Sequence, residues 1–169
     1  MEQQRDEEAF ARVVAEKLSP VEFPRSASYD AKWVLENLMG PNVLWLAESL
    51  SEVLELRPGM RVLDMGCGKA ISSIFLAKEF GVQVWATDLW IPAAENGLRI
   101  RAAGVEDSVC PIHAEAHALP FAEGFFDALV SLVRKEGQWH FKDANGDDLG
   151  LSWSEPSFAE LAQAALEPK

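Results

Sequence analysis

The stretch that most constrains the fold of this chain spans residues 61–89 and reads RVLDMGCGKAISSIFLAKEFGVQVWATDL. An apolar strand ends in Asp64, a glycine-containing loop opens a helix, and a second apolar strand ends in Asp88. The order of strand, glycine turn, helix, strand and acid is typical of one half of a nucleotide-binding α/β unit.

Strands and helices continue to alternate beyond this stretch. Hydrophobic periodicity predicts four strands, at 60–65, 82–87, 109–113 and 126–132. It predicts helices between the first three strands, at 70–80 and 92–103. Strands joined through helices of this length predict a parallel sheet with right-handed crossovers. The expected fold class is therefore α/β, a Rossmann-like doubly wound parallel sheet with three αβα layers.

The segments on either side of this core have different patterns. Apolar residues recur at helical spacing in 2–18, 29–39 and 42–56, which predicts helices before the sheet. We expect one domain made of an N-terminal helical segment (1–56), an α/β core (57–132) and a divergent tail (133–169).

The tail is too short for the remaining helices and strands of a complete doubly wound domain. In 138–153, aromatic and apolar residues flank Asn145-Gly146, a dipeptide that favours a two-residue hairpin turn. We expect a shortened C-terminal half with this hairpin and a short helix at 157–166. The hairpin would either cover an open sheet edge or take the place of the hairpin that ends a complete domain. A homodimer is a further way to cover such an edge.

The composition limits which classes of partner and which cell compartment we expect. The chain has 169 residues and a formal net charge of −12, which repels nucleic acids and anionic membranes. Its two cysteines are too few for a disulfide framework. The first residues lack a signal-peptide pattern, and no apolar run approaches the roughly 18 residues that cross a bilayer. We expect a cytoplasmic protein with no nucleic-acid and no membrane partner.

The glycine loop does not match the common phosphate-binding patterns. Gly66 and Gly68 allow close approach of a ligand, but Ile71 replaces the third glycine of the dinucleotide pattern. A carboxylate at Asp64 would repel a pyrophosphate and attract an ammonium group. Asp88 would accept the hydroxyl hydrogens of a ribose. The loop therefore favours a ligand with an amino-acid end and a ribose.

Three segments together resemble a known family. VLDMGCGKA, ATDLW and AEAHALPFAEGFFDALVS look like successive motifs of the class I S-adenosylmethionine-dependent methyltransferases, particularly the small-molecule type-11 group. The resemblance covers 56–132, and the segment after Leu132 departs from the family pattern. It implies S-adenosylmethionine as the cofactor and a small molecule as the methyl acceptor.

The resemblance also implies a set of cofactor-binding residues. Asp64 and the loop Gly66-Cys67-Gly68 would hold the methionine portion, and Asp88 would hold the ribose. The remaining implied contacts are to the adenine, from Leu89, Trp90, Glu115 and Ala116.

Residues outside these motifs are weaker candidates. Tyr29 and Trp33 would bind the substrate if the N-terminal helices face the cofactor, although aromatic residues at helical spacing are more often core. No residue is nominated as catalytic, because the methyl donor is already activated and the protein mainly aligns donor and acceptor. Neither His113-Ala114-Glu115 nor the acidic segment 143–148 has the ligand spacing of a zinc or calcium site, so we expect no metal.

Two functions remain open from the sequence. One is S-adenosylmethionine-dependent methyl transfer to a small molecule. The other is a non-catalytic module that binds S-adenosylmethionine or assembles with other proteins, having lost the strands on the acceptor side.

Overall fold

A computed structural model describes residues 22–135, 138–142 and 148–153. These residues form six strands in one sheet, in the order β3-β2-β1-β4-β5-β6. The strands are β1 (Arg61–Met65), β2 (Gln83–Asp88), β3 (Val109–His113), β4 (Ala128–Lys135), β5 (Gln138–Lys142) and β6 (Asp148–Trp153). The predicted helices at 2–18 and 157–166 lie outside the described residues.

The first four strands are parallel, as the alternating pattern predicted. Val62 of β1 pairs with Val84 of β2 on one side and with Ala128 of β4 on the other. The fourth strand begins and ends later than predicted, at Ala128 and Lys135. The first two residues of the predicted strand, Phe126 and Asp127, precede the observed strand, and the Phe126 ring packs on Trp85.

The tail hairpin forms and extends the sheet. β5 pairs antiparallel with β4, and β6 pairs antiparallel with β5. The hairpin therefore covers the open edge of β4, which is the first of the two roles expected for it. Residues 143–147, which include the predicted turn, lie outside the described residues.

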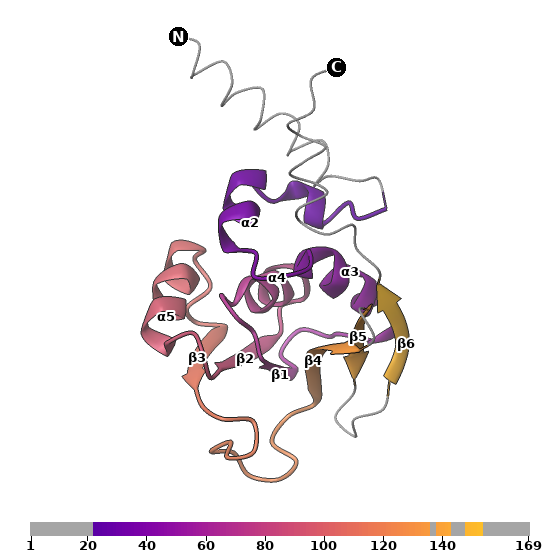
Figure 1. The fold of residues 1–169 in the computed structure, drawn as a ribbon. Coiled ribbons are helices and arrows are strands. Elements are labelled where there is room, and N and C mark those ends of the chain that lie inside the picture. Colours follow the sequence, from indigo (N-terminus) through magenta and orange to yellow (C-terminus); the bar gives the residue numbers. More distant parts are fainter. Residues whose placement is uncertain (1–21, 136–137, 143–147, 154–169) are drawn as a thin grey trace, which may run out of the picture.

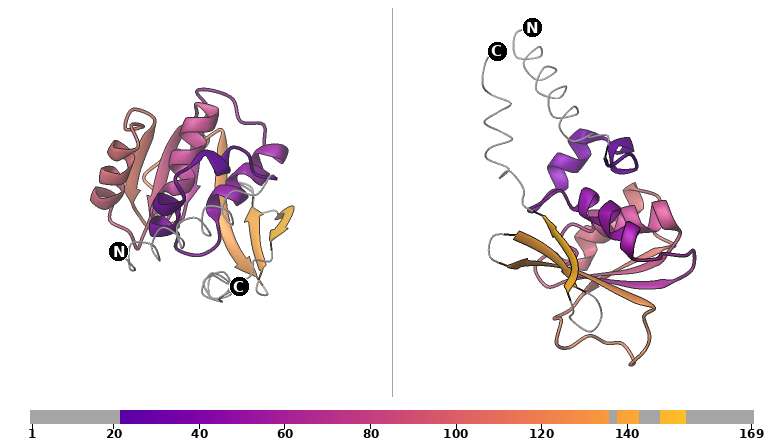
Figure 2. Two further views of the ribbon diagram at one scale, coloured as in Figure 1. Left: turned by 90° about the horizontal axis from the view of Figure 1, so that it is seen from above. Right: turned by 90° about the vertical axis from the view of Figure 1, so that its right-hand side faces the viewer.

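The described helices are gathered on one side of the sheet, as the views in Figures 1 and 2 show. They are α2 (Ala31–Asn37), α3 (Val43–Val53), α4 (Ile71–Phe80) and α5 (Ala93–Ala102), after a short 3-10 turn, η1 (Ser26–Ser28). The connection 114–127 between β3 and β4 runs below the sheet without a helix (Figure 1). Of the three expected αβα layers, the described residues form the sheet and one helical layer. Aromatic rings cover part of the other face of the sheet.

Helix α4 is the centre of the core. Its first seven residues, Ile71–Ala77, are all buried, and Ile74 and Phe75 have no exposed surface. Each such apolar side chain contributes roughly 1.5–3 kcal/mol by leaving water. Because α4 follows the glycine loop directly, this burial fixes the loop against the sheet.

The N-terminal segment is fastened to the core through a buried carboxylate. Glu48 of α3 is 7% exposed and accepts hydrogen bonds from the backbone amides of Arg25 and Ser26 and from the Ser26 hydroxyl. Arg25 also pairs with Glu79 of α4 at 3.2 Å. These contacts hold the chain before α2 over the same face that α4 covers.

Candidate functional site: a glycine loop between two buried aspartates

The glycine loop, Gly66-Cys67-Gly68, lies between the carboxyl ends of β1 and β2. The amides of Gly66 and Cys67 both donate to the carbonyl of Thr87, at 2.8 and 3.1 Å. Gly66 has φ +80°, and a Cβ there would point into open space. The loop therefore leaves bare backbone facing a gap, which is the geometry a closely approaching ligand needs.

Asp88 fastens the loop to the end of β2. Its Oδ2 accepts from the Gly68 amide at 2.8 Å, and its Oδ1 accepts from the amides of Trp90 and Ile91 at 2.7 and 2.9 Å. The side chain is 6% exposed. A carboxylate has about four lone-pair positions, so three bonds leave capacity for one ligand hydroxyl. Asp88 thus shapes the loop, and we predict that it also contacts the ligand.

Asp64 is buried beneath the same loop. Both Ser72 and Ser73, from the first turn of α4, donate their hydroxyls to its Oδ2 at 2.6 Å. Its other oxygen has no hydrogen bond within the described part of the chain. Burial raises the pKa of Asp64, the two serine hydrogen bonds oppose the increase, and the nearby Asp88 adds to it.

These two carboxylates fit a ligand that carries both a cation and hydroxyl groups. A bound ammonium would neutralise the buried charge of Asp64, and neutral hydroxyls would suit the remaining lone pair of Asp88. The same pair disfavours a phosphate, because two buried acids with no described basic partner flank the loop. The donor set therefore fits an aminoacyl nucleoside better than a nucleoside diphosphate.

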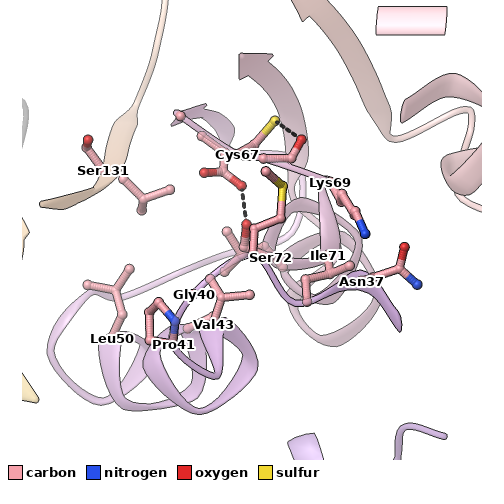
Figure 3. Close-up of a pocket in the computed structure, with 17 residues that line it drawn as sticks. Asn37, Gly40, Pro41, Val43, Leu50, Cys67, Lys69, Ile71, Ser72 and Ser131 are labelled. Carbon is pink, nitrogen blue, oxygen red and sulfur yellow. Dashed lines mark hydrogen bonds between the residues drawn. The ribbon is translucent and has the colours of Figure 1, made fainter. Parts of the chain in front are cut away.

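A pocket of about 160 Å³ opens over Asp64 and the loop. Figure 3 shows Pro41, from the connection before α3, and Val43 and Leu50 of α3 on one wall. Cys67 and Lys69 lie on the opposite side, with Ser72 between. Val130 and Ser131 of β4, which pair with Asp64 and Met65 of β1, close a further side. The wall supplied by α3 and β4 is mostly apolar, and the polar groups lie at the loop.

Cys67 lines this pocket but is not a reactive nucleophile. Burial raises the pKa of its thiol well above the ordinary range, and the charges of Asp64 and Asp88 raise it further. The thiol therefore stays protonated at neutral pH. A small side chain in the bend of the loop accounts for its presence.

The predicted adenine contacts lie together beyond the end of β2. Leu89 and Trp90 are 52% and 85% exposed, and Glu115 and Ala116 are exposed on the segment that follows β3. The Ala114 amide donates to the Asp88 carbonyl at 3.3 Å, which brings that segment beside β2. His113 Nε2 lies 3.0 Å from the Leu89 carbonyl. The adenine-binding roles remain predictions, and the structure supplies their common location.

Tyr29 and Trp33 do not line this pocket, and their role in substrate binding stays a prediction. They line a separate hollow with Ile74 and Lys78, on another side of α4. The Tyr29 hydroxyl donates to Glu79 at 3.1 Å, and its ring packs on Phe75. Both are half-buried against the core, and helical spacing did not indicate which neighbour they pack against.

Three further residues of the site were missed from the sequence. Asn96 of α5 is 1% exposed and donates to the Gly68 carbonyl at 2.9 Å. Ser72 and Ser73 hold Asp64, as described above. For the two serines, the available signal was their polarity between Ile71 and Ile74, since buried polar side chains require a partner. Asn96, between Glu95 and Gly97, gave no such signal.

No helix in the described ranges is long and apolar enough to cross a membrane. Within those ranges, no three His, Cys, Asp or Glu side chains gather as a metal site would require.

Comparison with known proteins identifies the α/β segment. Residues 62–145 match the family model described as "Methyltransferase domain". Residues 62–145 therefore belong to the methyltransferase domain family. This match confirms the family resemblance stated from the sequence, for the part of the chain that carries the glycine loop.

Relatives with this methyltransferase domain are similar over about half of the chain. Demethylmenaquinone methyltransferase of Mycobacterium marinum is 35% identical over 92 residues, 54% of this chain and 36% of the relative. The 27-O-demethylrifamycin SV methyltransferase of Amycolatopsis mediterranei is 34% identical over 99 residues, 56% of this chain and 36% of the relative. The chain thus spans about a third of the length of the curated relatives it matches.

Among solved structures, a SAM-dependent methyltransferase from Thiobacillus denitrificans in complex with S-adenosyl-L-homocysteine is 26% identical. The match covers 52% of this chain and 36% of that one, with a TM-score of 0.45.

Proposed function

We propose that the protein binds S-adenosylmethionine and transfers its methyl group to a small-molecule acceptor. The observation that carries the proposal is the placement of Asp64 and Asp88 on either side of the glycine loop, within a methyltransferase domain. When bound, the cofactor supplies an activated methyl group on a sulfonium. The residues described here bind and orient it and exclude water.

Each part of the site has a defined role in this proposal. Asp64 accepts the ammonium of the methionine portion, and Asp88 accepts a ribose hydroxyl. Leu89 and Trp90 contact the adenine, and Glu115 and the Ala116 amide complete that end. The Ser72 and Ser73 hydroxyls stabilise the ionised form of Asp64, which is the form that holds an ammonium.

The pocket supports a small and largely uncharged methyl acceptor. Val43, Leu50 and Val130 line it, and the relatives named above methylate small molecules by their descriptions. No side chain is assigned as a general base. We place the acceptor on the side of the pocket formed by α3 and by Val130 and Ser131 of β4.

A second function is favoured by the order of the strands. β4 turns directly into the antiparallel β5, so no further parallel strand follows β4 in the described sheet. A module with this arrangement would bind S-adenosylmethionine without turnover. The proposed methyl transfer and this alternative share the cofactor site and differ in the acceptor site.

Calorimetric titration with S-adenosylmethionine, S-adenosylhomocysteine and NAD tests the shared premise. We expect the two sulfur nucleosides to bind and NAD, with its pyrophosphate, to bind far more weakly. Equal binding of NAD would contradict the charge argument. Transfer of a radiolabelled methyl group to a pool of small apolar acceptors then separates the functions, because binding without transfer supports the alternative.

The remaining expectations about cell context are part of the same proposal. A cytoplasmic protein without nucleic-acid or membrane partners agrees with the acidic charge and with Cys67 and Cys110 both being free. The hairpin covers the β4 edge within the chain, so a dimer is not needed there. A homodimer that pairs strands would instead use β3 or β6, the two edge strands of the described sheet.

A further inference from the structure

The connection between α2 and α3, residues 38–42, lies across the glycine loop. We call it the α2–α3 strap. Met39, Gly40 and Pro41 of the strap line the same pocket as Asp64 and Gly66.

The strap is held in place by the residue that follows the loop. Lys69 Nζ donates to the Glu36 carbonyl, in the last turn of α2, at 2.7 Å. Asn42, at the other end of the strap, is 5% exposed and caps α3 by accepting from the Leu44 amide. The ends of the strap are therefore fixed, and its middle lies next to the loop.

Met39 makes the closest approach. A Cβ built on Gly68 would lie 3.1 Å from the Met39 Sδ, so the sulfur sits directly above the bare backbone of the loop. The Met39 side chain is an unbranched chain that contains a sulfur atom, so it resembles in shape the amino-acid chain of the methionine portion of the proposed ligand. Two such chains cannot occupy the same surface of Gly68.

We propose that Met39 occupies the subsite for the amino-acid end of the ligand and determines how strongly that end binds. The inference rests on the proposed function, because it assigns the loop beside Asp64 to the methionine portion. Ligands that carry this portion must displace Met39, whereas nucleosides that lack it bind without moving the side chain.

The exposure of Met39 sets the size of the effect. The residue is 58% exposed, so it loses little buried surface when it leaves the loop. The need to displace Met39 therefore reduces the affinity for the ligand only modestly. The affinity is multiplied by the fraction of molecules in which Met39 has already left the loop. We expect about a three- to tenfold effect.

The test compares Met39→Ala with Met39→Leu, which keeps an apolar side chain of similar length. Titrations use S-adenosylhomocysteine, which has the amino-acid end, and 5′-methylthioadenosine, which lacks it. We expect Met39→Ala to bind S-adenosylhomocysteine about three- to tenfold more tightly than wild type, with its affinity for 5′-methylthioadenosine unchanged. Met39→Leu should bind both as the wild type does.

The outcomes separate this inference from the proposed function. Equal changes for both nucleosides, no change for either, or weaker binding of S-adenosylhomocysteine by Met39→Ala would overturn the role of Met39 and leave the cofactor site intact. If wild type and both variants bind neither nucleoside, the proposed function fails and this inference fails with it.

Discussion

The Asp88 carboxylate accepts a hydrogen bond from the Gly68 amide at 2.8 Å and so joins the end of β2 to the glycine loop. The same side chain accepts from the amides of Trp90 and Ile91. One carboxylate therefore sets the shape of both segments that would surround the ribose. Its predicted role as a ligand contact and its structural role are linked.

Replacing Asp88 tests this link. We expect Asp88→Ala to weaken S-adenosylhomocysteine binding at least about tenfold, and to lower the free energy of unfolding by about 1.5–3 kcal/mol, because buried amides lose a charged acceptor. Calorimetry and urea denaturation measure the two effects. Asp107→Ala, at an exposed loop position, is the control and should change neither. A variant with normal stability and normal affinity would remove Asp88 from the site.

The ionised Asp64 carboxylate should strengthen ligand binding but lower the stability of the fold. Its pKa is raised in the folded state, so the native protein holds the proton more tightly than the unfolded chain does. The stability contributed by protonated Asp64 is complete below about pH 4, the ordinary value for Asp, and is lost as the pH rises through the higher folded pKa. Asn cannot ionise, so Asp64→Asn does not lose this stability as the pH rises.

We therefore expect Asp64→Asn to be at least as stable as wild type at pH 7, with an advantage that shrinks at pH 4. Its affinity for S-adenosylmethionine should fall at least about tenfold, because the ammonium loses its charged partner. Asp127→Asn is a control of opposite sign, because hydrogen bonds from Arg61 lower the pKa of Asp127. A less stable Asp64→Asn at pH 7 would show that the buried charge is not a cost.

Asn96 is predicted to position the loop from outside the motif. Its Nδ2 donates to the Gly68 carbonyl, and its Oδ1 accepts from Arg99 at 3.0 Å. Asn96→Ala should lower the free energy of unfolding by about 1–3 kcal/mol, because the part-buried Gly68 carbonyl loses its amide donor. Asn96→Asp should weaken ligand binding further, since it places a carboxylate against that carbonyl.

Denaturation and S-adenosylhomocysteine titration of both Asn96 variants check this expectation. Arg99→Ala keeps the bond to Gly68 and removes only its neighbour, so it should have a smaller effect. If Asn96→Asp binds as tightly as wild type, the contact to Gly68 does not position the loop.

The sequence allowed prediction of the parts of the site that are close together along the chain. Asp64 and the glycines are adjacent in one motif, and the alternation of strand and helix then places Asp88 at the same sheet edge. Contacts across the fold were not predictable in this way. Periodicity predicted helices at 92–103 and 29–39, but the packing of α5 decides that Asn96 reaches Gly68, and the position of the chain before α2 decides that Tyr29 reaches Glu79.

The helix after the loop begins with a strained residue. Ala70 has φ +59° and ψ 21°, in the left-handed region, and has no exposed surface. This conformation costs a non-glycine residue about 1–2 kcal/mol. Ala70→Gly would relieve that strain, but it would remove a buried methyl group worth about 0.8 kcal/mol and give the unfolded chain more freedom, worth about 0.4–1 kcal/mol.

These terms nearly cancel, so we expect Ala70→Gly to change the free energy of unfolding by less than about 1 kcal/mol. Ala70→Val should instead lower it by at least about 2 kcal/mol, because a β-branched side chain at positive φ is strongly disfavoured. Ala77→Val is the matched control, since Ala77 is also buried in α4 but has ordinary helical geometry. Urea denaturation of the three variants separates backbone strain from overpacking. Equal losses for Ala70→Val and Ala77→Val would show that the left-handed turn before α4 carries no strain.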